Sequence, residues 1–224
     1  MEALLNAFSV CFWARKLRSN GVCGPHVISY EGDGFANEIV VSDEMGCNII
    51  FGSNVDLSEN FKVTPGAWYH YCSCWSLSSG TQSVYLNGQL VSSRATPSGR
   101  TLRNGGFLAI GNDAGSEGKG MSSSFKFGGE LYKLNFFSKE LSSTEVQEMA
   151  RHKCSTAEET YGDLRSIKWE DILLMRRSGV VTDIRTECRI VGRYILCKYA
   201  YQQNNFGISP HVSCISPRAP ARGG

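Results

Sequence analysis

Short segments rich in aromatic and β-branched residues recur along the chain, separated by clusters of turn-forming residues. The clearest of them lie at residues 7–14, 26–30, 38–41, 48–51, 68–75, 83–86, 89–92, 107–111 and 129–137. Glycine, proline, aspartate and asparagine gather between them, as at residues 32–34, 64–66 and 104–106. Short strands alternating with turns are typical of antiparallel sandwiches and jelly rolls. The pattern predicts an all-β fold, an antiparallel two-sheet jelly-roll sandwich with one or two short helices.

The strongest turn signal is the pair Asn87-Gly88, which joins two segments of alternating apolar residues. Both residue types tolerate the positive φ angles that the two central positions of a type I′ turn require. The pair therefore predicts a two-residue β-hairpin between residues 83–86 and 89–92.

One helical pattern interrupts the strands. Ser142 and Glu145 have the spacing of a capping box, in which each side chain bonds the backbone of the other residue. An apolar face follows at Val146, Met149 and Ala150. We expect a helix that begins at Ser142 and ends near residue 154, and a second helical turn around residues 169–175.

Composition and charge change near residue 188. The formal net charge is +2 at pH 7, yet residues 189–224 contain five basic residues and no acidic one. We expect a β-sandwich domain over residues 1–188 and a basic, partly disordered C-terminal appendage over residues 189–224. In the rest of the chain basic residues are interleaved with acidic ones, which is typical of a solvated surface. A nucleic-acid partner is therefore not expected.

Nine cysteines are many for a cytosolic chain of 224 residues. None has the Cys-x-x-Cys spacing of zinc ribbons or thioredoxin-like sites. Their wide spacing in a β-rich chain predicts disulfides and an extracellular location, either secreted or at the cell surface. An odd total leaves at least one thiol free or bonded to another chain. The cysteines are Cys11, Cys23, Cys47, Cys72, Cys74, Cys154, Cys188, Cys197 and Cys214.

The targeting signals are weak. The chain has no apolar run of the roughly 18 residues that a membrane span needs. Residues 1–14 are apolar, but Glu2 stands where a signal peptide is positively charged, and no small-residue cleavage site follows. We interpret this segment as a β-strand. An extracellular location then implies that the sequence is a fragment or a part of a longer product.

Residues 70–76, His-Tyr-Cys-Ser-Cys-Trp-Ser, resemble the pentraxin signature His-x-Cys-x-Ser/Thr-Trp-x-Ser/Thr. Cys74 and Leu77 depart from it, because serine or threonine is usual at both positions. Other segments resemble the family in the same order, at residues 8–11, 86–112, 128–145 and 167–173. From about residue 7 to residue 188, the chain is similar to a divergent, N-terminally shortened pentraxin, and this resemblance implies a concanavalin A-like lectin fold.

The resemblance implies a disulfide between Cys11 and Cys72. Such a bridge closes a loop of about 60 residues, for which the chain-entropy treatment gives roughly 4 kcal/mol of stabilisation. His70 and Trp75, the other signature residues, are expected to be structural, His70 through a hydrogen bond and Trp75 as part of the core.

The remaining cysteines are less constrained. A bridge between Cys154 and Cys188 would tie the helix to the last strand of the sandwich. The other pairings stay open between Cys23–Cys47 and Cys47–Cys74. Cys197 and Cys214 are candidates for a free thiol that joins subunits.

Calcium is the cofactor that the resemblance implies, and it requires six to eight oxygen ligands. Asn37 matches a family ligand, but Ala36 stands where a ligating aspartate is expected. Asp113 holds a carboxylate position, whereas Gly115 replaces a second one. The predicted metal ligands are therefore Asn37 and Asp113, with Glu117 as a further candidate. So few carboxylates predict a weak site, in the millimolar range.

Two activities known on related folds are disfavoured. Binding of phosphocholine would need an aromatic residue where Ser42 stands and an acid near Asn48. Glycoside hydrolysis would need two carboxylates on one strand face. Glu31 and Asp33 have a suitable spacing but lie among glycines, which predicts a turn.

The function predicted from the sequence is non-catalytic recognition of a polysaccharide, lipid headgroup or protein ligand, in innate defence or adhesion. The resemblance further implies possible ring-like homo-oligomers. The alternative is a metal-free interaction module within a larger cell-surface receptor or matrix protein, and a glycan-degrading enzyme is a third, weaker hypothesis.

Overall fold

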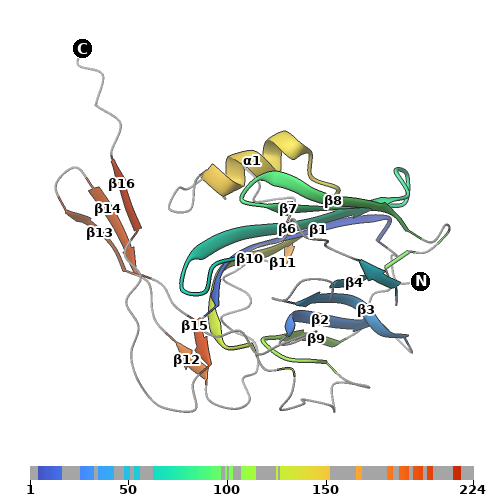
Figure 1. Cartoon of the computed structure of the whole chain (residues 1–224), viewed down its shortest axis with the longest axis horizontal. Helices are drawn as coiled ribbons and strands as arrows, with labels where there is room; N and C mark the ends of the chain where they lie inside the picture. The colour runs from blue at the N-terminus through green and yellow to red at the C-terminus, as the bar shows by residue number, and fades with distance from the viewer. Residues whose placement is uncertain are drawn as a thin grey trace.

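The computed structural model in Figure 1 shows two antiparallel sheets that face one another, with a helix on the outer side of the larger sheet. The structure describes residues 5–16, 26–32, 35–42, 48–50, 53–55, 63–96, 99, 101–102, 107–114, 125 and 127–151, and short strands between residues 165 and 217. The predicted all-β, two-sheet sandwich with a short helix is confirmed.

The larger sheet has six strands in the order β11-β10-β1-β6-β7-β8. Its central strands, β1 (Ala7–Lys16) and β6 (Trp68–Ser76), pair antiparallel along their whole length. A bulge between Cys11 and Trp13 interrupts the pairing of β1 with β10. The remaining strands are β7 (Thr81–Leu86), β8 (Gln89–Ala95), β10 (Gly129–Phe137) and β11 (Arg165–Ile167).

The smaller sheet has five strands in the order β5-β4-β3-β2-β9. Its strands are β2 (His26–Gly32), β3 (Phe35–Ser42), β4 (Asn48–Ile50), β5 (Ser53–Val55) and β9 (Phe107–Ile110). All nine predicted strand segments are therefore strands, while β5 in this sheet, β11 in the larger sheet and the strands after residue 180 are additional ones. Glu31 lies in β2, opposite Phe107, so the predicted turn at this residue is wrong. The hydrogen-bonded ladder with β9 extends the strand as far as Glu31.

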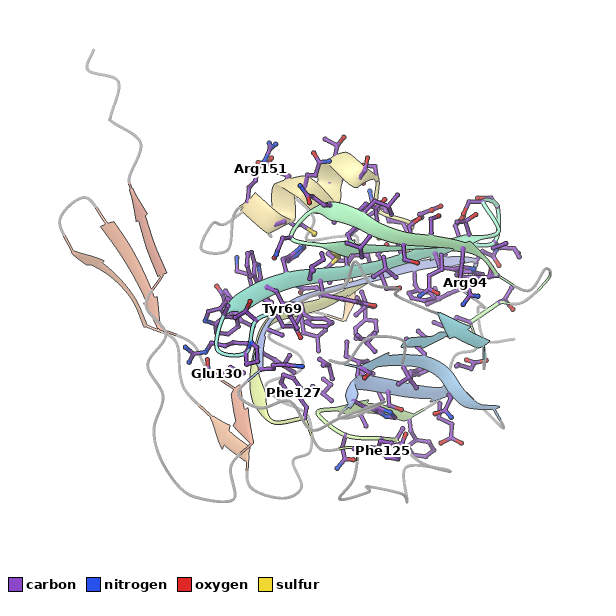
Figure 2. All side chains as sticks on the ribbon, in the orientation of Figure 1. Tyr69, Arg94, Phe125, Phe127, Glu130 and Arg151 are labelled. Atoms are coloured by element: carbon purple, nitrogen blue, oxygen red, sulfur yellow. A yellow bond between two sulfur atoms is a disulfide. The ribbon has the colours of Figure 1, made fainter. Side chains whose placement is uncertain are left out.

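The core lies between the two sheets. Alternate residues of β1 and β6 point into it, so that Phe12 stacks on Tyr71 with ring centroids 5.0 Å apart. Ile28 and Ile39 of the smaller sheet belong to the same buried core cluster. Each such fully buried side chain contributes about 1.5–3 kcal/mol by leaving water. Figure 2 shows one end of this core, near the start of β10, where Tyr69 and Phe127 also lie buried.

Helix α1 (Ser143–Arg151) begins at the predicted capping box. The Ser142 amide donates to Glu145 Oε2 at 2.8 Å, and the Glu145 amide donates to Ser142 Oγ at 3.3 Å. Val146 anchors the helix to the outer face of the larger sheet, where it packs with Leu141 and Phe137. The second helical turn expected around residues 169–175 lies outside the described residues.

The predicted hairpin joins β7 to β8. Asn87 and Gly88 have φ angles of 50° and 81°, which are the positive values that the sequence predicted for both turn residues. The turn lies against α1, because a Cβ placed on Gly88 would come 3.1 Å from the Ala150 Cβ. Turn and helix therefore meet at a position where glycine is needed.

The C-terminal region contributes further short strands. β12 (Val181–Asp183) pairs with β15 (Tyr201–Gln203), and a separate sheet has the order β13-β14-β16. The latter strands are β13 (Glu187–Val191), β14 (Tyr194–Lys198) and β16 (Cys214–Pro217). The proposed domain boundary after residue 188 falls inside β13. Among the described residues, no helix has the length and apolar character needed to cross a membrane.

Candidate functional site

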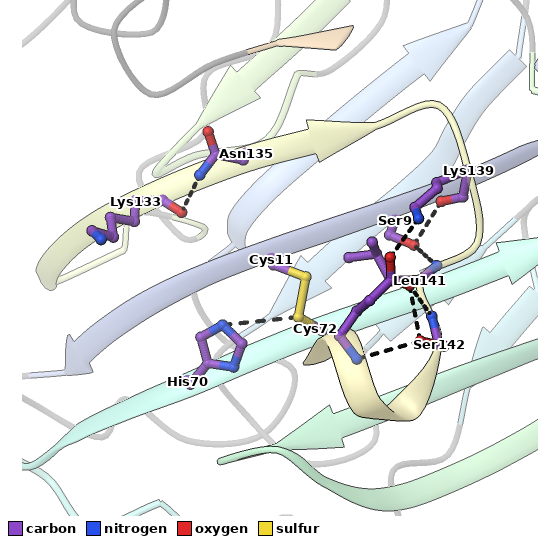
Figure 3. The surroundings of a disulfide bond; sticks show 10 residues. Ser9, Cys11, His70, Cys72, Lys133, Asn135, Lys139, Leu141 and Ser142 are labelled. Carbon is purple, nitrogen blue, oxygen red and sulfur yellow. Dashed lines mark hydrogen bonds and ion pairs between the residues drawn. A yellow bond between two sulfur atoms is a disulfide. The ribbon is translucent and has the colours of Figure 1, made fainter. Parts of the chain in front are cut away.

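The signature residues lie on the two central strands of the larger sheet. Cys11 and Cys72 are direct cross-strand partners, with Cα atoms 4.2 Å apart, and they form the disulfide that the resemblance implied. Both side chains are buried under α1 and its neighbours (Figure 3). The bridge therefore connects the first strand to the middle of the sheet, inside the protein.

His70 lies beside this disulfide. Its Nε2 atom is 3.9 Å from Cys72 Sγ (Figure 3). Its ring packs against Trp13, with ring centroids 5.1 Å apart. Burial, together with the charge of Lys133, lowers the pKa of His70 to about 3, so the ring is neutral at physiological pH. The His70 amide also donates to Asn87 Oδ1 at 2.9 Å, which ties the hairpin turn to β6. These contacts hold the His70 ring in the sheet beside the disulfide.

Trp75 and Cys74 complete the signature and are buried. The Trp75 indole donates from Nε1 to Thr96 Oγ1 at 3.0 Å and packs on Phe8. Cys74 is a free, buried thiol whose pKa is raised to about 12 by burial. The structure thus gives Cys74 no disulfide partner, and Cys47, its proposed partner, lies outside the described residues. None of these signature side chains offers a ligand surface.

A second group of polar residues lies on the outer face of the smaller sheet. Ser29 of β2 donates from Oγ to Asp113 Oδ1 at 3.2 Å, which places Asp113 over the face opposite Ile28 and Ile110 of the core. The His26 Nδ1 atom is 3.6 Å from the same carboxylate oxygen, and the His26 ring stacks on Phe125. The chain after β9 therefore turns back over β2.

The pKa of His26 reflects two opposing effects. Burial lowers it below 6.5, whereas the charge of Asp113 and its contact with the ring raise it. The burial effect is the larger one, so the ring is neutral at physiological pH. The Asp113 carboxylate of this cluster accepts a hydrogen bond from the Ser29 hydroxyl.

Asn37, the other predicted metal ligand, lies farther along β3. It has a φ of 57°, and it is three positions from Val40, the residue that pairs with Ser29. At about 3.3 Å per residue, roughly 10 Å of strand separates this position from the Ser29–Asp113 contact. Among the residues that the structure describes, no three His, Cys, Asp or Glu side chains form a group able to hold a metal ion. The structure therefore does not bring Asn37 and Asp113 together in such a group, and Glu117 lies outside the described residues.

Phe107 is a residue that the sequence pattern did not single out. It is 50% exposed, lies opposite Glu31, and shares the outer face with Ser29 and Asp113, because its neighbour Leu108 packs on the core. Strand alternation places Val40 and Ser42 on this face as well, and both are buried. The sequence does not indicate that this ring is exposed, since strands that face the core are also rich in aromatic residues.

Comparisons with known proteins agree with this architecture. The family model described as the concanavalin A-like lectin/glucanases superfamily matches residues 2–147. C-reactive protein 1.1 of Limulus polyphemus is 26% identical over 190 residues, which cover 82% of this chain and 77% of that protein. Neuronal pentraxin-2 of Homo sapiens is 30% identical over 68% of this chain, but the match spans only 35% of that longer protein. A heptameric SAP-like pentraxin from Limulus polyphemus has a TM-score of 0.58 at 24% identity, covering 66% of this chain and 70% of that chain, a likeness of fold.

Proposed function

The chain belongs to the concanavalin A-like lectin/glucanase superfamily and is pentraxin-like within it, and from this premise we propose that it is an extracellular recognition protein. Its relatives are pentraxins, and its fold is that of a lectin-like, non-catalytic binding module. The ligand in this proposal is a polysaccharide, a lipid headgroup or a protein, and the setting is innate defence or adhesion.

The observation that carries the proposal is the outer face of the smaller sheet. It combines the half-exposed ring of Phe107 with the partly exposed Asp113 carboxylate, which accepts a hydrogen bond from the buried Ser29 hydroxyl. An aromatic face suits the apolar side of a sugar ring, and a carboxylate suits its hydroxyls. Polysaccharide is therefore the first ligand class to test.

The test is the substitution Phe107→Ala, with binding of the full chain measured on a glycan array and on phosphatidylcholine vesicles. Loss of the stacking contact should weaken glycan binding about threefold to tenfold, which corresponds to roughly 0.5–1.5 kcal/mol. Leu90→Ala is the matched control, because Leu90 is 56% exposed on β8 of the other sheet. Equal effects of the two substitutions, or no glycan binding by the wild-type chain, would contradict the proposal.

Calcium enters the proposal only as a weak contributor. Asp113 supplies one carboxylate that already accepts a hydrogen bond from Ser29, so an ion would have to compete with this contact. Calorimetric titration with calcium should give millimolar binding that Asp113→Asn abolishes. Heat release that saturates at micromolar calcium would contradict the weak-site proposal, and the absence of any heat of binding would favour the metal-free alternative.

The alternative is a metal-free module within a larger receptor or matrix protein. It is favoured by the match to only about a third of neuronal pentraxin-2, which shows the same fold carried in a longer chain. The lectin-like function, by contrast, favours assembly into homo-oligomers, since linked weak sites raise the overall affinity. Sedimentation of the full chain distinguishes the two functions: an oligomer supports the lectin-like protein, and a monomer supports the metal-free module.

A further inference from the structure

Three cysteines occupy equivalent positions on three neighbouring strands. The sheet order is β13-β14-β16, and the register pairs Cys188 with Cys197 and Cys197 with Cys214. We call these three residues the cysteine ladder. We propose that Cys197 forms one cross-strand disulfide, with either Cys188 or Cys214, and that the third cysteine of the ladder exchanges into it.

The distances required for such a bridge follow from the register. Directly opposite residues of antiparallel strands have Cα atoms about 4.5–5.5 Å apart. Disulfides span Cα distances of about 4.4–6.8 Å. The same protein already contains a bridge between direct cross-strand partners, because Cys11 and Cys72 are paired in this way. Both pairs of the ladder therefore meet the distance condition.

Only one of the two ladder bridges can exist at a time. Cys197 has a single sulfur, which forms a single disulfide. Cys188 and Cys214 lie two strands apart, about 9–10 Å, which is beyond the reach of a direct bridge between them. One cysteine is thus left as a thiol, and it always lies on an outer strand of this sheet.

The ladder order also supplies a route for exchange. The thiolate of the third cysteine attacks the sulfur of Cys197, a new disulfide forms, and the former partner leaves as a thiolate that takes up a proton. Attacking, central and leaving residues lie in one row across the sheet, which is the order that such a displacement needs. The first bridge forms when two ladder thiols give up two electrons and two protons to glutathione disulfide, which becomes two glutathione thiols.

This pairing competes with the Cys154–Cys188 bridge predicted from the sequence. Cys154 lies outside the described residues, whereas the register gives Cys188 a neighbour in Cys197. A Cys154–Cys188 bridge would leave Cys197 with Cys214 but no third thiol to exchange, so a disulfide between the peptides that hold Cys154 and Cys188 contradicts the exchange. The inference does not depend on the proposed ligand.

Trypsin separates the ladder cysteines cleanly. Cleavage after Arg185, Arg189, Arg193, Lys198 and Arg218 places Cys188, Cys197 and Cys214 on three different peptides. The full chain is equilibrated in a glutathione redox buffer, alkylated, and digested without reduction for mass spectrometry. We expect peptide 194–198 to be joined to peptide 186–189 or to peptide 199–218. An alkylated Cys197, or its linkage to a cysteine outside the ladder, overturns the proposal, provided that the Cys11–Cys72 bridge is intact.

Single substitutions test the exchange. Cys188→Ser should direct all of Cys197 to Cys214, and Cys214→Ser should direct it to Cys188. Cys74→Ser is the matched control and should leave the wild-type distribution unchanged. If either ladder variant leaves Cys197 as a free thiol while the other does not, one bridge cannot form and the exchange is disproved.

Discussion

At the residue scale, burial decides which sulfur atoms of the sandwich can react. Cys74 is two residues from Cys72 and lies in the same buried group as the Cys11–Cys72 disulfide. Burial raises the pKa of Cys74 to about 12, whereas hydrogen bonds from Ser9 and the Leu141 amide oppose this rise only in part. A thiol attacks a disulfide as the thiolate, so the neighbouring bridge is protected from exchange.

We therefore predict that Cys74 resists alkylation in the native protein. Native iodoacetamide treatment at pH 8 should leave it unmodified for hours, because only about one thiol in ten thousand is ionised at that pH. Denaturant should expose it and give complete modification, read by mass spectrometry of the peptide. Fast native labelling of Cys74 would show that the site opens or is solvated. The Cys74→Ser variant has a hydroxyl that can make the same hydrogen bonds, so its free energy of unfolding should lie within about 1 kcal/mol of the wild-type value.

At the scale of elements, the hairpin and the helix hold one another in place. The Asn87-Gly88 turn lies against Gln147 and Ala150 of α1. Ser9 of β1 holds the segment before the helix, because it accepts a hydrogen bond from the Leu141 amide at 2.9 Å and donates to the Lys139 carbonyl at 2.8 Å. The outer layer of the larger sheet is thus fixed at both ends of α1.

Gly88→Ala should destabilise the protein by about 2–3 kcal/mol. Positive φ costs alanine roughly 1 kcal/mol or more, and the new methyl group would press on α1 at 3.1 Å. Gly80→Ala is the matched control, since Gly80 has a φ of 60° but open space around the position. Urea unfolding should show a difference of about 1 kcal/mol or more between the variants. Equal losses would mean that the helix contact adds nothing.

The capping box should make the stability of the protein depend on pH, because protonation of Glu145 weakens it. Burial alone would raise the pKa of Glu145, but the hydrogen bonds and charge of Lys139 and the hydrogen bonds from Ser142 outweigh it, and the pKa falls below 4.5. A carboxyl group whose pKa is lower in the folded than in the unfolded state stabilises the protein at pH values above its unfolded-state pKa. This stabilisation is lost as the pH falls through the folded-state pKa. The stability difference between wild type and Glu145→Gln should therefore be present at pH 6 and shrink below about pH 4.5. Urea unfolding at several pH values measures it, and a constant difference would contradict the prediction.

At the scale of the whole molecule, the Cys11–Cys72 bridge spans the connection between the two sheets. The 61-residue separation that it closes contains β2, β3, β4 and β5, which belong to the smaller sheet. In the unfolded chain, the bridge therefore limits the distance between the segments that form the smaller sheet and those that form the larger one. A link at this point stabilises the sandwich as a unit.

Replacing both cysteines, as Cys11→Ala with Cys72→Ala, should lower the free energy of unfolding by about 2–5 kcal/mol. The loss follows from the freer unfolded chain and from the missing sulfur contacts in the buried layer under α1. Chemical denaturation compares this variant with the wild type and with Cys74→Ser, which keeps the bridge. A loss below about 1 kcal/mol in the double variant would show that the bridge is not what stabilises the sandwich.

Short-range patterns were sufficient for the elements and for much of their order. Short segments rich in aromatic and β-branched residues predicted nine of the strands, Asn87-Gly88 predicted the hairpin turn, and Ser142 with Glu145 predicted the start of the helix. The family resemblance predicted the Cys11–Cys72 bridge, which the structure contains. These features depend on residues that are neighbours in the sequence, or on a family motif in which the bonded positions are known, so they can be predicted without coordinates.

Only the tertiary structure decided which distant residues share a face. Glu31 is in a strand and not in a turn because β9 pairs with it, and Phe107 is exposed because its register points it away from the core. Asp113 meets Ser29 because the chain folds back after β9, and three cysteines align because β13, β14 and β16 pair in register. Such placements follow from long-range strand pairing, and a shift of one residue would reverse every face, so local sequence cannot determine them.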